Sequence, residues 1–152
     1  MLYQGLPLYA IVEAPELGLR FEANALTGQV WLNGQPVSQM AGPVSTPPKV
    51  VAHGSRSRGI PHPLLEVLPR RFQMTDYIPS VAVTAGRMVT RDEQSHDAIS
   101  SVVTLTNDSI PAAILLSTAA GKATRLDGSS FFPITWDDLS QPDRRLPMIA
   151  GV

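Results

Sequence analysis

Residues 99–136 constrain the fold of this chain most strongly, because they alternate short apolar runs with residues that favour tight turns. Residues 102–106 are mostly β-branched, and β-branched side chains suit the pleated surface of a strand. Residues 107–109 carry short polar side chains that bond their own backbone and stop such a run. This pattern predicts antiparallel β-structure.

The same block contains further predicted strands. Residues 112–118 form a continuous apolar run between Pro111 and Gly121, which favours a buried strand over a helix. Residues 122–126 lead into Asp127-Gly128, a strong signal for a tight turn. A last strand is predicted at 131–136. Its proline indicates an edge strand or a bulge, because proline cannot donate a ladder hydrogen bond.

The first part of the chain also shows strand patterns. Residues 8–12 and 18–22 are predicted strands, and residues 29–37 form a predicted hairpin around Asn33-Gly34. Asn-Gly is typical of a tight hairpin turn because both residues tolerate positive φ. Pro36 limits the returning arm to a short pairing at a sheet edge. Strand character returns at residues 78–90.

The distribution of proline and the low fraction of charged residues indicate the domain organisation. Residues 36–79 hold eight of the 14 prolines, and only 16% of the chain is charged, against about 25% in typical domains. The sequence predicts a single all-β domain over residues 1–152, an antiparallel sandwich or barrel with a jelly-roll or immunoglobulin-like topology. Residues 40–63 are predicted as a proline-rich arm or long loop, with a short strand near 49–52, and residues 141–152 as an extended tail.

No catalytic or metal motif stands out. The three histidines, His53, His62 and His96, lack the spacing of a metal site. The sequence contains no nucleophile elbow, no Walker loop and no dinucleotide-binding fingerprint. We therefore expect no enzyme, no cofactor and no metal. An enzyme using His96 beside Asp97 is the less favoured alternative.

Charge is distributed unevenly along the chain. Residues 49–91 carry seven basic and two acidic residues, whereas residues 92–152 carry eight acidic and four basic ones. Such asymmetry can make copies of a chain complementary to one another. Nucleic acid is a less favoured partner because the pI is about 6.3 and no binding motif is present. The predicted interface residues are Pro47, Pro48, Arg56, Arg58, Arg70 and Arg71 in the arm and Arg144, Arg145 and Leu146 in the tail.

The absence of cysteine, the proline-rich arm, the hairpin at 30–37 and the pattern at 121–136 are loosely similar to small β-rich structural proteins of viral particles. Capsid decoration, vertex and tail-associated subunits are of this kind. The resemblance implies an assembly-forming protein that joins other copies and other subunits in a virion. The sequence shows no secretory signal and no apolar run near the ~20 residues that span a bilayer, so we expect a protein that is made in a cytoplasm and spans no membrane. The rival interpretation is a β-sandwich that binds carbohydrate or peptide through Trp31, Tyr77 and Trp136.

Overall fold

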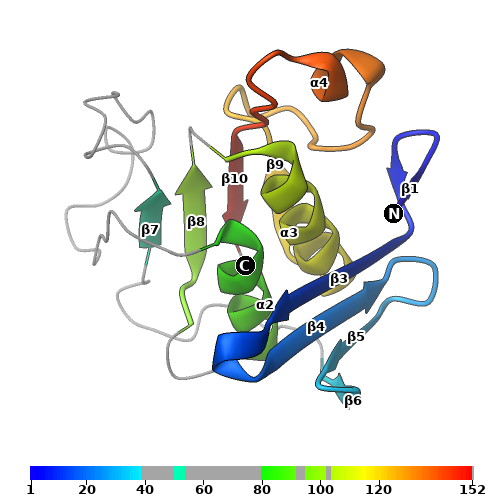
Figure 1. Cartoon of the computed structure of the whole chain (residues 1–152), viewed down its shortest axis with the longest axis vertical. Coiled ribbons are helices and arrows are strands. Elements are labelled where there is room, and N and C mark those ends of the chain that lie inside the picture. Colours follow the sequence, from blue (N-terminus) through cyan, green and yellow to red (C-terminus); the bar gives the residue numbers. More distant parts are fainter. Residues whose placement is uncertain (39–49, 54–79, 92–94, 102–103, 152) are drawn as a thin grey trace.

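Two helices packed between two four-stranded sheets form the architecture of this chain (Figure 1). The computed structural model describes residues 1–38, 50–53, 80–91, 95–101 and 104–151. Helices α2 (Val81–Thr90) and α3 (Thr106–Thr118) pack against each other, and both contact strands of each sheet. The prediction of an all-β sandwich or barrel is therefore wrong, because the central layer is helical.

The first sheet is an antiparallel meander of consecutive strands, with the order β3-β4-β5-β6. Its buried side chains alternate with exposed ones, as in a sheet with one covered face. Asn33 and Gly34 have φ of 51° and 77°, which confirms the predicted hairpin turn. The strands are β3 (Tyr9–Ala14), β4 (Leu19–Asn24), β5 (Gln29–Leu32) and β6 (Gln35–Val37), and a short 3-10 helix, η1 (Pro15–Leu17), joins the first two.

The second sheet is mixed and has the order β7-β8-β10-β9. Strand β7 pairs in parallel with β8, and the other pairs are antiparallel. Strand β10 lies between β8 and β9, so the predicted extended tail supplies an inner strand instead. The strands are β7 (Val50–His53), β8 (Ala98–Ser101), β9 (Lys122–Thr124) and β10 (Met148–Gly151).

A small peripheral unit is built from the N-terminal hairpin and the segment that leads into helix α4 (Trp136–Ser140). Strands β1 (Leu2–Tyr3) and β2 (Leu6–Pro7) form a tight hairpin, and Gly5 at its turn accepts a hydrogen bond from the Ile134 N–H at 2.8 Å. Helix α4 begins two residues later. The edge strand predicted at 131–136 is not formed, because the chain turns at a cis Phe132–Pro133 bond and then enters α4.

Helices α2 and α3 replace the strands predicted at 78–90 and 112–118, and α3 also includes the turn predicted at 107–109. In α2, eight of the ten residues are buried, and α3 is also buried on most of its surface. Helix α3 shows almost no amphipathic period, so its sequence resembles a buried strand. In α2 the β-branched valines are typical of a strand and outweigh the helical pattern. None of the described helices is long and apolar enough to cross a membrane.

Candidate functional site at a helix junction

The Asp108 carboxylate joins the first turns of the two central helices. It lies in the first turn of α3 and accepts three hydrogen bonds from the start of α2. The Ser80 hydroxyl donates to Oδ1 at 2.5 Å, the Val81 N–H to Oδ2 at 2.8 Å and the Ala82 N–H to Oδ1 at 2.9 Å. Both carboxylate oxygens are therefore engaged in holding α2 beside α3.

Ser80 forms the N-cap of α2. Its backbone is extended, and its hydroxyl oxygen accepts a hydrogen bond from the Val83 N–H at 3.2 Å. Serine favours this position because its side chain satisfies one of the free N–H groups of the first helical turn. Ser80 and Asp108 together satisfy three N–H groups, those of Val81, Ala82 and Val83.

Two helix N-termini consequently lie side by side. Each N-terminus carries a partial positive charge of about half a unit, which favours a negative group nearby. The N-cap of α3, Leu105, makes no side-chain hydrogen bond to the first turn. The negative charge of Asp108 in that turn stabilises α3 by its interaction with the helix dipole. The arrangement is suited chemically to attract an oxyanion to the junction.

The described residues do not offer a metal centre at this junction. Among them, no three His, Cys, Asp or Glu side chains are grouped as metal ligands. Both carboxylate oxygens of Asp108 already accept hydrogen bonds from three neutral donors. A cation site needs several converging oxygen ligands, so this set of donors does not fit one.

A second carboxylate cluster lies at the rim, where α4 meets the end of β9. Arg125 donates two parallel hydrogen bonds to Asp138, at 2.6 and 2.8 Å. Thr135 and Asp138 also form a capping box at the start of α4. The paired guanidinium holds the pKa of Asp138 well below its ordinary value, and the hydrogen bonds from Thr135 act in the same direction. This cluster fastens α4 to the body of the chain.

A third polar group lies on the exposed face of the first sheet. The Tyr9 hydroxyl donates to Glu22 at 2.6 Å, and Arg20 donates to both Glu22 and Glu13. The hydrogen bonds from Tyr9 and then Arg20 lower the pKa of Glu22, and the same bond to Glu22 raises the pKa of Tyr9. These contacts cross neighbouring strands and are exposed, so they indicate a stabilised surface and not a reaction centre.

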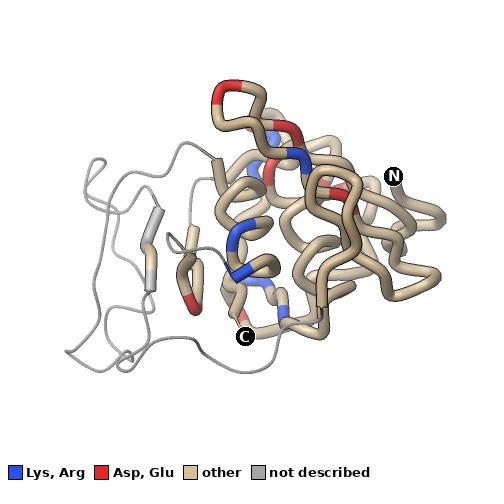
Figure 2. Tube along the Cα trace, turned by 90° about the horizontal axis from the view of Figure 1, so that it is seen from below, with Lys and Arg blue, Asp and Glu red and all other residues tan. Residues whose placement is uncertain are grey.

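The structure tests the predicted interface only in the tail. Pro47, Pro48 and the four arm arginines lie outside the described residues. Of the seven basic residues at 49–91, the described part contains only Arg87 and Arg91, both at the C-terminal end of α2. Figure 2 shows where basic and acidic positions lie along the described trace. In the tail, Arg144 is exposed and Arg145 half-buried. Leu146 is only 4% exposed and belongs to the core, so it does not serve as a surface contact.

The predicted aromatic platform is not assembled in the described residues. Trp31 is half-buried on β5, whereas Trp136 is 79% exposed on α4. Strand β5 and helix α4 lie at opposite ends of the molecule in Figure 1. Tyr77 lies outside the described residues. The two tryptophans therefore do not form a common surface.

The histidine predictions are largely untested. The His53 and His62 side chains lie outside the described residues, and His96 is half-buried immediately before β8. Its neighbour Asp97 is buried, and both residues interact with other groups of the fold. Among the described residues, no third His, Cys, Asp or Glu side chain joins this pair as a metal ligand.

Neither Ser80 nor Asp108 is among the residues predicted from the sequence. The pattern at 107–109 predicts a turn between strands, whereas Asp108 lies in the first turn of α3. A recognisable signal was present, because a serine directly before an apolar run is a common helix start. The valines that follow Ser80 suggested a strand and hid that signal.

No protein-family model matches the sequence, and no curated protein matches it by sequence. The structure, in contrast, is similar to several solved chains. A hypothetical protein from Pyrococcus horikoshii, described as having similarities to inositol-1 monophosphatase, matches over 99% of this chain and 54% of its own length, with a TM-score of 0.70 and 17% identity.

Two ligand-bound structures show the same likeness. Inositol monophosphatase II from Staphylococcus aureus with bound inositol monophosphate has a TM-score of 0.65 and 15% identity, over 97% of this chain and 52% of its own. An inositol monophosphatase/NADP phosphatase complexed with NADP and Ca²⁺ has a TM-score of 0.66 and 11% identity, over 98% and 52%. This chain therefore spans about half the length of the solved chains that it matches.

These neighbours overturn two expectations. They are phosphatases or phosphatase-like proteins, so the interpretation as a virion structural subunit, and with it the rival sugar- or peptide-binding β-sandwich, is wrong. The same likeness contradicts the expectation that the protein is not an enzyme. With identities between 11% and 17%, the likeness establishes architecture: the chain has an inositol-monophosphatase-like fold with helices and sheets.

Proposed function

We propose that this chain recognises a phosphomonoester, as part of a phosphatase of the inositol-monophosphatase type. The observation that carries the proposal is the match of 97–99% of the chain to folds that include structures solved with inositol monophosphate and with NADP. Both ligands carry a phosphate group esterified to a single alcohol. Shared recognition of that group is the common chemistry of these neighbours.

The helix junction is the part of the described chain best suited to this chemistry. The N-termini of α2 and α3 converge on Asp108, and helix N-termini favour phosphate through their N–H groups and their dipoles. Asp108 fixes the relative position of the two helices and neutralises part of their charge. In this proposal a phosphomonoester lies beside the junction, where it competes electrostatically with that carboxylate.

The proposal concerns recognition and includes no metal-dependent step, because the described donors do not fit a metal centre. Ligand pairs that differ only in the phosphate test it directly. Isothermal titration of the chain with inositol monophosphate and with 2′-AMP should give saturable binding, whereas inositol and adenosine should bind at least about tenfold more weakly. Equal binding of phosphorylated and unphosphorylated partners would contradict the proposal.

The Asp108→Asn variant tests the location of the site. The amide keeps the shape and one oxygen acceptor, and it removes a negative charge. Titrated in a chelator, so that no cation bridges ligand and carboxylate, the variant should bind inositol monophosphate about two- to tenfold more tightly than the native chain. Asp137→Asn, an exposed carboxylate on α4, is the matched control and should leave the affinity unchanged. An Asp108→Asn variant that binds as the native chain does would place the phosphate elsewhere.

A further inference from the structure

One asparagine side chain joins two turns at the end of the first sheet. The Arg20 N–H donates to the Asn33 Oδ1 at 2.8 Å, and the Asn33 Nδ2 donates to the Gly18 carbonyl at 3.0 Å. The Asn33 N–H also donates to the Arg20 carbonyl at 2.8 Å. Through these three hydrogen bonds, which we call the Asn33 joint, the turn between β5 and β6 holds the residues that follow η1.

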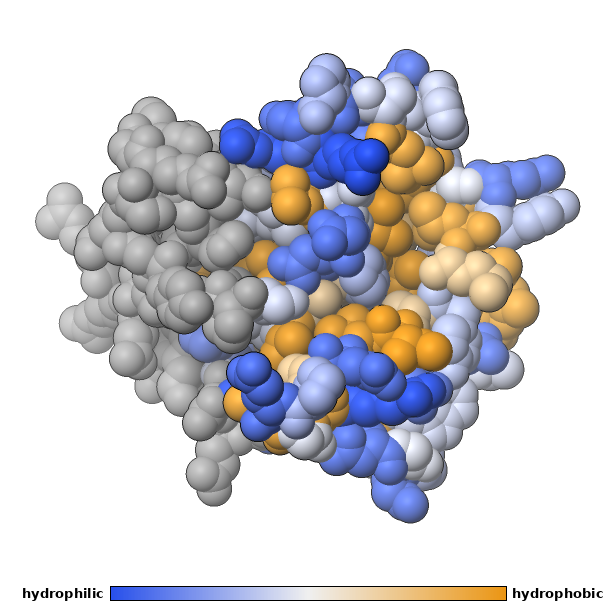
Figure 3. Space-filling model, viewed as in Figure 1, coloured by the Kyte–Doolittle hydropathy of each residue, from blue (hydrophilic) through white to orange (hydrophobic). Residues whose placement is uncertain are grey.

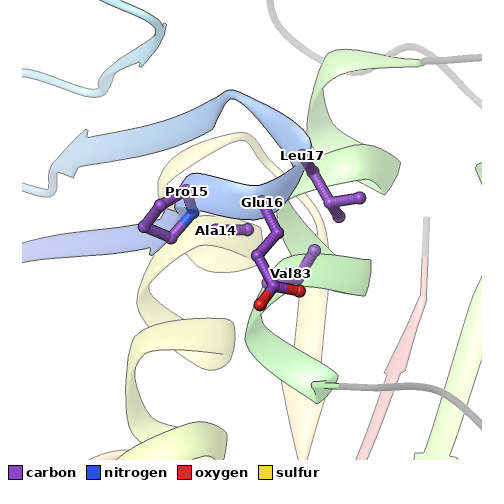
Figure 4. A pocket seen from close by; sticks show the side chains of 5 residues that line it. All are labelled: Ala14, Pro15, Glu16, Leu17 and Val83. Atoms are coloured by element: carbon purple, nitrogen blue, oxygen red, sulfur yellow. The ribbon is translucent and has the colours of Figure 1, made fainter.

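The Asn33 joint fixes a segment that lies against helix α2. Gly18 ends η1 in the left-handed conformation, and its N–H donates to the Pro15 carbonyl at 3.0 Å. The residues of η1 and Val83 of α2 line a common hollow, and their side chains lie close together in Figure 4. A release of Gly18 would therefore loosen the contact between η1 and the start of α2.

Asn33 is followed by Gly34, and an asparagine before glycine is prone to spontaneous deamidation. The Gly34 nitrogen attacks the Asn33 Cγ, the Cγ–Nδ2 bond breaks, and ammonia leaves with the proton from Gly34. Water then opens the resulting succinimide at either of its carbonyls and gives aspartate or isoaspartate. Glycine has no Cβ to obstruct the attack. Of the three asparagines in the chain, only Asn33 precedes a glycine.

The Asn33–Gly34 turn is accessible to the water that this reaction needs. Both residues are exposed, and Figure 3 shows hydrophilic side chains where the β5–β6 hairpin lies. In the closed joint, the two side-chain bonds hold the Asn33 amide against Gly18 and Arg20. Its Cγ is then not free to turn to the Gly34 nitrogen, so modification waits until the joint opens.

We infer that Asn33 is a deamidation site, and that the Asn33 joint restrains the reaction and is broken by it. Each opening of the joint exposes the Asn33 amide to attack by Gly34. In the aspartate product a carboxylate oxygen replaces Nδ2 and faces the Gly18 carbonyl, so two acceptors meet where a hydrogen bond was. The loss of ammonia makes the change irreversible. The site does not depend on the phosphate recognition proposed above.

Peptide mapping by mass spectrometry tests whether the joint restrains the reaction. The chain is incubated in mildly alkaline buffer, which favours loss of the Gly34 amide proton, with and without denaturing urea. Deamidation of Asn33 should be at least about tenfold faster in urea, where the joint is open. Asn24 lies in the same tryptic peptide but precedes alanine, so it is the internal control and should stay intact.

A pair of variants opens the joint in the folded chain. Arg20→Pro removes the N–H that donates to Asn33 and should accelerate deamidation about fivefold. Arg20→Ala keeps that N–H and removes the same side chain, so it is the matched control and should leave the rate unchanged. Circular dichroism verifies the fold of both variants. If Arg20→Pro does not fold, the comparison with urea and the aspartate variants below still decide the proposal.

Two aspartate variants test whether the product breaks the joint. Asn33→Asp reproduces the product and removes the donor to Gly18, so the folding equilibrium constant from urea denaturation should fall about tenfold. Asn24→Asp is the matched control, because the printed contacts of Asn24 use its Oδ1 as an acceptor from the Leu26 and Thr27 N–H groups and a carboxylate keeps that role. It should change the constant by less than about twofold.

Three results would overturn the proposal. An Asn33 that stays intact in urea is not a deamidation site. Equal deamidation rates in the native chain and in urea, or in folded Arg20→Pro and Arg20→Ala, would show that the joint does not restrain the reaction. An Asn33→Asp variant as stable as Asn24→Asp would show that the product leaves the joint closed.

Discussion

Two carboxylates in this chain each collect a cluster of hydrogen bonds, one at the helix junction and one at the rim. Asp108 accepts from a hydroxyl and two main-chain N–H groups that belong to a different helix. Asp138 accepts from a guanidinium and from the cap of its own helix. The first cluster joins two elements of the central layer, and the second fastens a five-residue helix to the outside.

The difference lies in which groups lose their partners when the carboxylate is removed. At the junction, donors at the buried start of α2 would remain without an acceptor, and an unsatisfied buried group costs about 1–3 kcal/mol. At the rim, Arg125 and Thr135 can turn to water. Similar hydrogen bonds should therefore contribute unequally to stability, and variants of the two clusters test this comparison.

The largest effect is expected for Asp108→Ala. The substitution leaves the Ser80 hydroxyl and the Val81 and Ala82 N–H groups without their acceptor, and it weakens both helix starts. We expect the free energy of unfolding to fall by about 3 kcal/mol, measured by urea denaturation followed by circular dichroism. Glu16→Ala, an exposed carboxylate in no described ion pair, should change it by less than about 0.5 kcal/mol. Equal effects would show that Asp108 is not a structural joint.

A substitution at Gly86 tests how closely the middle of α2 packs against the first sheet. A Cβ at this position would lie 2.5 Å from the Phe21 ring, which is itself buried. Gly86→Ala therefore forces α2 away from the first sheet, and we expect a loss of about 2 kcal/mol despite the better helix propensity of alanine. Phe21→Leu in the same chain should recover part of the loss, because the smaller side chain makes room. Additive losses in the double variant would contradict direct contact.

The first sheet could be predicted from sequence because its signals are local. Strands at 8–12 and 18–22 and the hairpin at 29–37 correspond to β3, β4, β5 and β6, each paired with the next along the chain. The Asn33-Gly34 turn and the brief edge strand with Pro36 follow from backbone preferences alone. The strand at 49–52 and the start of β9 at Lys122 were also located.

The central layer and the junction could not be predicted in the same way. Residues 112–116 form a continuous apolar run that is fully buried, because α3 lies between two sheets, so no helical period marks them. Pro111 appears to exclude a helix, yet it lies inside α3, which continues past it although one main-chain hydrogen bond is lost there. The Ser80–Asp108 contact joins residues 28 positions apart, and no short pattern encodes such a contact.

Asp138→Ala should have a smaller effect than either change in the central layer. It removes two hydrogen bonds from Arg125 and half of the capping box of α4. We expect a loss of about 1–2 kcal/mol, because the pair is near the surface and the freed guanidinium regains water. Amide hydrogen exchange in α4 should therefore be faster in the variant than in the native chain under conditions where the rest of the fold is intact.

The stabilisation that Asp138 provides at the rim should depend on pH. The folded-state pKa of Asp138 is depressed by Arg125, so this residue stabilises the fold fully above its unfolded pKa of about 3.9. The contribution is lost as the pH falls below that value, because the unfolded chain then binds the proton more readily. The stability difference between the native chain and Asp138→Asn should therefore shrink from about pH 6 to about pH 2.5. A constant difference would show that the ion pair is not formed.

The smallest effect is expected at Thr135, and it separates the cap of α4 from the ion pair. The Thr135 hydroxyl accepts from the Asp138 N–H at 3.2 Å and donates to the carboxylate at 2.9 Å. Thr135→Ala should lower stability by about 1 kcal/mol, and Thr135→Ser, which keeps the hydroxyl, by less than about 0.3 kcal/mol. In a chain that already carries Asp138→Ala, Thr135→Ala should cost less, because the capping box is already half lost. If the cost is the same in both backgrounds, Thr135 caps α4 on its own. The rim would then be held by two separate contacts, whereas the junction depends on a single carboxylate.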